Sequence, residues 1–215
     1  MKDWSWQQVA FAALATLIVP VALTRLAFAT GILEALIAGA MYKAIAHTAE
    51  THALVAFLGA ALPTLESVAP LLALTAVAGW DRAPLSCAVA GAALALIALA
   101  YPLVALPEYA QHADAFGPEL MGVTKLLYAS LGFAGFVTGL ATAMSGRGPR
   151  SAAIVWVAAA ILQFCTLGVM AWWMKIAWGM VFVWSPSSVA VYTSTSMVAV
   201  GWSALAVAFA IKGRS

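Results

Sequence analysis

Long, nearly uninterrupted apolar stretches are the feature that most constrains how this chain can fold. A helix that crosses the ~30 Å hydrocarbon core of a bilayer needs about 20 residues, and stretches of this length follow one another along the sequence. Backbone polar groups in lipid must be bonded within their own segment, so each stretch is expected to be an α-helix. The predicted spans are 6–24, 26–46, 54–79, 85–106, 123–144, 151–174 and 188–211.

The composition supports a membrane protein and excludes other classes. Of the 215 residues, 65% are apolar and 8% are charged, whereas a soluble domain is roughly half apolar and about a quarter charged. The net charge of +2 is too small for a nucleic-acid-binding protein. We therefore predict one all-α, polytopic membrane helical bundle over residues 1–215, without a soluble domain or a nucleic-acid partner. We expect it in the cytoplasmic (inner) membrane of a bacterium.

The first two spans are not separated by a polar loop. Between Trp6 and Lys43 there is no polar loop, and only Pro20 and Thr24–Arg25 suggest a break between two helices. A single helix of this length would be much longer than the membrane is thick. We divide it at Arg25; a broken or interfacial first segment, and hence six spans, is the alternative.

The distribution of charge predicts an orientation. With seven spans and a cytoplasmic C-terminus, every arginine falls on the inner side, while most acidic residues fall on the outer side. This asymmetry follows the positive-inside rule, so the N-terminus is expected outside. The inner cations are Arg25, Arg82, Arg147, Arg150, Lys212 and Arg214.

Two predicted spans carry faces of small residues. Helices in lipid associate by close packing, which small residues permit. We expect both faces to be buried against other helices of the chain rather than against lipid. They comprise Ala27, Gly31, Ala35 and Gly39 in one span, and Gly132, Gly135 and Gly139 in the other.

Polar side chains occur at the predicted mid-depth of the membrane. Glu66, Glu34 and Gln163 lie near the midpoints of three different spans, where an ionised side chain costs ~2.5–3.5 kcal/mol on insertion scales. These three groups could meet inside the bundle. Thr195 belongs to a hydroxyl-rich run in the last span, which could line a path or bond back to its own helix.

Two prolines flank Glu66. Proline deprives the carbonyl four residues earlier of its helical hydrogen bond, so Pro70 frees the carbonyl of Glu66 and Pro63 frees that of Gly59. Interrupted membrane helices with free carbonyls form ion or proton sites. Glu66 is therefore a candidate proton or cation relay; a protonated, structural carboxyl is the alternative.

Histidines and carboxylates gather on the predicted outer side. Imidazole and carboxylate groups are suitable ligands for a divalent metal, but His47 and His52 would point ~140° apart on one helix. We interpret these histidines mainly as solvated loop residues or as part of a pH-sensitive outer gate, with a metal site as the alternative. The candidate ligands are His47, Glu50, His52, His112 and Asp114.

These observations lead to three functional hypotheses. The first is a transporter or channel for a small solute or ion, coupled to protons or cations through Glu66. The second is a membrane-anchor or accessory subunit of a larger redox or assembly complex, and the third is a membrane-embedded, metal-dependent enzyme that uses the outer-side ligands. We favour a non-enzymatic role because no motif places a catalytic nucleophile. The expected partners are the lipid bilayer, a small solute or ion, and partner subunits or further copies of the chain; the sequence identifies no cofactor.

Overall fold

A computed structural model describes residues 53–77, 79, 81–110, 117–180 and 186–213, and this part of the chain is all-helical. Its helices correspond to the third to seventh predicted spans, while the predicted spans 6–24 and 26–46 lie outside the described residues. The helices are α4 (Ala53–Val77), α5 (Ala83–Ala110), α6 (Gly117–Ser145), α7 (Pro149–Met180) and α8 (Pro186–Lys212).

The helix ends depend on backbone chemistry rather than on hydropathy. Helices α7 and α8 begin at Pro149 and Pro186. Proline suits a first helical turn because its φ is preset and its missing N–H would have no helical partner there. After α4, Gly79 adopts a φ of 79°, which is costly for residues with a Cβ, and its N–H donates to the carbonyl of Ala76 at 3.2 Å. Two helices are longer than predicted. Helix α6 starts at Gly117, with Pro118 in its first turn, rather than at residue 123. Helix α7 extends to Met180 rather than to residue 174.

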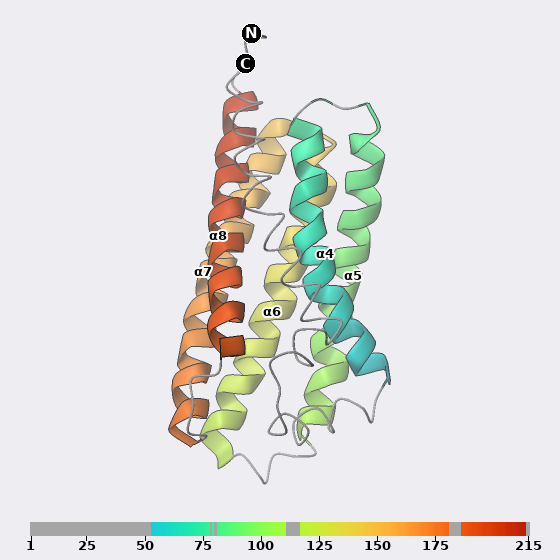
Figure 1. The fold of residues 1–215 in the computed structure, drawn as a ribbon. Coiled ribbons are helices and arrows are strands. Elements are labelled where there is room, and N and C mark those ends of the chain that lie inside the picture. Colours follow the sequence, from blue (N-terminus) through green and yellow to red (C-terminus); the bar gives the residue numbers. More distant parts are fainter. Residues whose placement is uncertain (1–52, 78, 80, 111–116, 181–185, 214–215) are drawn as a thin grey trace.

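The five helices run along a common direction, and consecutive helices run in opposite directions (Figure 1). Each helix packs against its neighbour in sequence from α4 to α7, and α7 packs against α8; α4 also contacts α6 and α8. The C-terminal ends of α4, α6 and α8 therefore lie beside the N-terminal ends of α5 and α7. We call this the basic end; its described charged residues are Asp81, Arg82, Arg147, Arg150 and Lys212.

The outward surface of the bundle is apolar. Leu85 and Leu103 on α5 are 73% and 75% exposed, and Ile154 on α7 is 71% exposed. Monomeric soluble proteins rarely expose large contiguous apolar patches. Among the described residues, the segments long and apolar enough to cross a membrane are Ala83–Pro107, Pro118–Ser145 and Pro149–Trp173, by length and composition. The fold is therefore consistent with an integral membrane protein.

Helices α5 and α6 pack with their backbones in close contact. A Cβ added to Gly139 would lie 2.6 Å from the Gly91 oxygen and 2.7 Å from the Ala95 nitrogen. Gly132 and Gly135 are buried on the same side of α6. The prediction that this glycine face is buried against protein is confirmed; the corresponding face of Ala27, Gly31, Ala35 and Gly39 lies outside the described residues.

Hydrogen bonds join α6 to α7 at three levels. The Trp156 indole donates to Ser145 Oγ at 2.9 Å, next to the turn between the two helices. The Thr166 hydroxyl is 3.4 Å from the carbonyl oxygen of Ser130, and near the other end the Trp173 indole donates to Thr124 Oγ1 at 2.9 Å. Buried polar groups in these helices thus fix the pairing of α6 with α7.

Candidate functional site

Glu66 lies near the middle of α4, and its side chain is only 4% exposed. Leu62 and Ala69 are also buried on α4 and belong to an apolar cluster with Leu94 and Ala98 of α5. Residues four before and three after Glu66 share its helix face. The carboxyl group is therefore enclosed in the bundle rather than directed to the outward surface.

Gly135 of α6 makes room for this carboxyl group. A Cβ at Gly135 would lie 3.2 Å from Glu66 Oε1, 3.2 Å from Leu62 Cδ1 and 2.8 Å from the Cβ of Ala98. These distances show that residues of α4 and α5 both reach the α6 backbone at this point. The absence of a side chain at Gly135 thus leaves a notch that the Glu66 carboxyl borders.

A backbone carbonyl of α5 belongs to the same region. Pro102 has no N–H to donate to the carbonyl of Ala98, four residues earlier. The Ala98 oxygen lies 2.8 Å from the position of a Cβ added to Gly132, one turn from Gly135 along α6. Pro63 and Pro70 were the prolines recognised from the sequence; the same rule applied to Pro102 predicts this free carbonyl.

Two tyrosines extend the polar region. The rings of Tyr101 on α5 and Tyr128 on α6 have centroids 5.5 Å apart at an interplanar angle of 46°, so the two phenol side chains are in contact. Tyr101 packs against the apolar cluster that surrounds Glu66. Sequence reasoning missed this pair, because nothing in the sequence indicates that Tyr101 and Tyr128 meet on neighbouring helices.

We refer to these groups together as the Glu66 cluster. Its oxygen atoms are those of the Glu66 carboxyl, the Ala98 carbonyl and the Tyr101 and Tyr128 hydroxyls, each of which can hydrogen-bond to water. Helices α4, α5 and α6 each contribute to it.

The other predicted site residues have different placements. Gln163 on α7 is buried, with 1% exposure, but α7 packs on α6 and α8, whereas α4 packs on α5, α6 and α8. Glu66 and Gln163 thus lie on helices connected mainly through α6 and α8. Pro70 is fully buried beside Ala69. Pro63 and Thr195 fall within α4 and α8, but their side chains lie outside the described part of the structure.

The predicted outer-side ligands also lie outside the described residues, together with Glu34. Within residues 53–77, 81–110, 117–180 and 186–213, no three His, Cys, Asp or Glu side chains are grouped in a way that could hold a metal ion. The ligands concerned are His47, Glu50, His52, His112 and Asp114.

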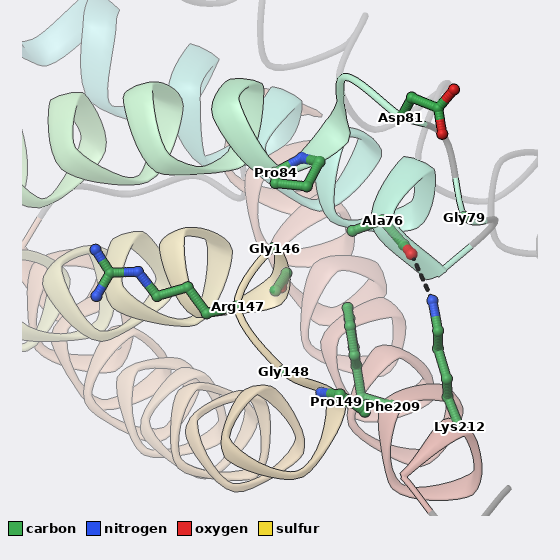
Figure 2. Close-up of a pocket in the computed structure, with 11 residues that line it drawn as sticks. Ala76, Gly79, Asp81, Pro84, Gly146, Arg147, Gly148, Pro149, Phe209 and Lys212 are labelled. Atoms are coloured by element: carbon green, nitrogen blue, oxygen red, sulfur yellow. Dashed lines mark hydrogen bonds between the residues drawn. The ribbon is translucent and has the colours of Figure 1, made fainter.

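A pocket of about 420 Å³ lies at the basic end, between the turns α4–α5 and α6–α7 and the end of α8 (Figure 2). Lys212 lines it, and its ammonium group donates to the carbonyls of Ala76 at 2.7 Å and Val77 at 3.3 Å. The side chain of Arg147 extends away from Lys212. Because cations stabilise helix C-termini, we assign Lys212 the role of capping α4.

No protein-family model matches the chain, and no curated protein or solved structure shows significant similarity to it.

Proposed function

We propose that this protein is a small polytopic membrane transporter or channel, with about seven helices, that moves a proton or small cation by way of Glu66. The observation that carries this proposal is a carboxyl group with 4% exposure, midway along a helix, in a bundle whose outward surface is apolar. A carboxyl group at this depth is costly when charged and is a functional candidate by default.

The chemistry of the Glu66 cluster supports the proposal. A carboxyl group is neutral when protonated and can release its proton when water or a cation reaches it. The Ala98 carbonyl, freed by Pro102, is a further polar group on the facing helix α5, where it lies against Gly132 of α6. Leu62 and Ala98 also approach the Gly135 notch, so a proton or a small cation fits this closely packed site better than an organic solute.

The orientation is also part of the proposal. The positive-inside rule places the basic end in the cytoplasm and the N-terminus outside, in a bacterial inner membrane. In a variant whose native cysteines, Cys87 and Cys165, are replaced by alanine, Arg147→Cys should react with a membrane-impermeant maleimide only when the cytoplasmic face is accessible. Labelling from the outside of intact cells would contradict this orientation.

The function is tested by proton or cation flux into liposomes that contain a pH- or cation-sensitive dye. Glu66→Gln keeps the shape of the side chain but cannot exchange a proton, so we expect the flux to fall at least about tenfold. Glu119→Gln is the matched control, because Glu119 is exposed in the first turn of α6. Equal flux in the wild type and in Glu66→Gln would refute the proposal.

The close enclosure of Glu66 favours one second candidate, a membrane-anchor or accessory subunit of a larger complex. In that case the carboxyl group would have a structural role. Purification of the tagged protein in a mild detergent would then yield a stoichiometric partner subunit, and Glu66→Gln would weaken the complex without any flux to lose.

A further inference from the structure

We propose that the Tyr101–Tyr128 pair is the proton relay that connects Glu66 with the end of the bundle opposite the basic end. This inference rests on the proposed function and specifies the route by which a proton reaches the carboxyl group.

The residues of the relay follow one seam between helices. On α6, Tyr128, Gly132 and Gly135 are spaced by four and three residues and therefore share a face. Gly132 and Gly135 both abut α5, and the Tyr101–Tyr128 ring contact continues this seam. Seven residues separate Tyr128 from Gly135, which corresponds to about 10 Å along the helix axis.

The directions of the helices bring the polar side chains toward each other. Side chains lean toward the N-terminus of their own helix. Helix α4 has its N-terminus away from the basic end, so Glu66 leans away from that end. Helix α5 runs in the opposite direction, so Tyr101 leans toward the basic end and hence toward the level of Glu66. The Ala98 carbonyl lies on the same face as Tyr101 and can orient a water molecule between the hydroxyl and the carboxyl.

Helices α5 and α6 are in close contact on both sides of Glu66, at Gly132 as well as nearer the basic end. There the backbones of Gly91 and Gly139 are in close contact, and a Cβ on either residue would overlap the other helix. The buried hydroxyls of Thr138 and Thr142 donate to carbonyls of their own helix, at 2.7 and 2.8 Å. These hydroxyls are engaged within α6, whereas the two tyrosines contact each other across the seam between α5 and α6.

The proton transfer is balanced without any oxidant or reductant. A hydronium ion gives a proton to the Tyr128 oxygen, whose own proton passes to the Tyr101 oxygen. The original Tyr101 proton then passes, directly or through one water, to the Glu66 carboxylate. Both tyrosines end as neutral hydroxyls, and the net change is one proton moved to Glu66. Rotation of the hydroxyls resets the chain.

The test compares proton flux in liposomes for Tyr101→Phe, Tyr128→Phe and the double variant. Phenylalanine keeps the ring and removes only the hydroxyl, so we expect each single variant to lose about tenfold in flux. Because the hydroxyls act in series, the double variant should lose little more than either single variant. Thr138→Val, which removes a buried hydroxyl on the basic side, should retain the flux of the wild type.

The outcomes separate the two proposals. Loss of flux in Glu66→Gln with full flux in both tyrosine variants overturns the relay and leaves the proposed function in place. Full flux in Glu66→Gln overturns the proposed function itself. Thermal unfolding of each variant in detergent shows whether the fold is kept; flux losses that parallel a loss of stability, and that add in the double variant, indicate a packing role and overturn the relay.

Discussion

Replacement of Gly139 by alanine should destabilise the bundle. The added Cβ would lie 2.6 Å from the Gly91 oxygen, which is 0.8 Å short of an ordinary 3.4 Å contact, and 2.7 Å from the Ala95 nitrogen. Both obstructing atoms belong to the α5 backbone and cannot rotate away, so the two helices must separate. Overpacking of this kind costs typically ~1–3 kcal/mol, of which alanine recovers about 0.5–1 kcal/mol through its better helix propensity. The expected net loss lies between about 0 and 2.5 kcal/mol, with about 1 kcal/mol at its centre.

Gly122→Ala is the matched control, for which no loss of stability is expected. Gly122 lies on the same helix, and a Cβ added there meets nothing within 4 Å. Gly122→Ala should therefore leave stability unchanged or raise it by up to about 1 kcal/mol. The free energies of unfolding can be measured from denaturant titrations in detergent micelles, followed by tryptophan fluorescence. If Gly139→Ala is as stable as Gly122→Ala, the close contact between α5 and α6 is not present in the protein.

Two further substitutions test polar contacts that join helices. Ser145→Ala leaves the indole N–H of the fully buried Trp156 without its acceptor. It should lower the free energy of unfolding by about 1–3 kcal/mol, measured by thermal or denaturant unfolding. The control Ser203→Ala removes only a bond to the Ala199 carbonyl of the same helix and should cost clearly less. Lys212→Met removes the cap on α4 and should cost about 1 kcal/mol, whereas Lys212→Arg should retain part of this stability. A loss for Ser203→Ala as large as that for Ser145→Ala, or full stability in Lys212→Met, would contradict these roles.

Hydropathy located the described helices but did not locate their ends. The predicted start at residue 123 lies within α6, because Gly117 and Pro118 open the helix outside the most apolar stretch. The burial of Gly132, Gly135 and Gly139 was predictable, since small residues in lipid mark helix contacts. Their partners on α5 were not, because a smooth helix face fits many others equally well.

The candidate site likewise combines features that the sequence predicted with features that it did not. The position of Glu66 near the middle of a helix followed from its place within an apolar stretch. The contribution of Tyr101 and Tyr128 did not, because a tyrosine in such a stretch gives no sign of which hydroxyl it will meet on another helix. Pro102 was visible in the sequence, but its consequence depended on the α6 backbone that lies opposite the Ala98 carbonyl.

The sequence by itself determined that the described chain is helical and apolar enough for a membrane, because backbone hydrogen bonding and transfer into lipid depend on each segment's own residues. Only the tertiary structure decided which faces meet. Helix association in lipid depends on the fit between surfaces distant in sequence, and that fit encloses Glu66 beside the Gly135 notch, together with the Ala98 carbonyl and the tyrosine pair.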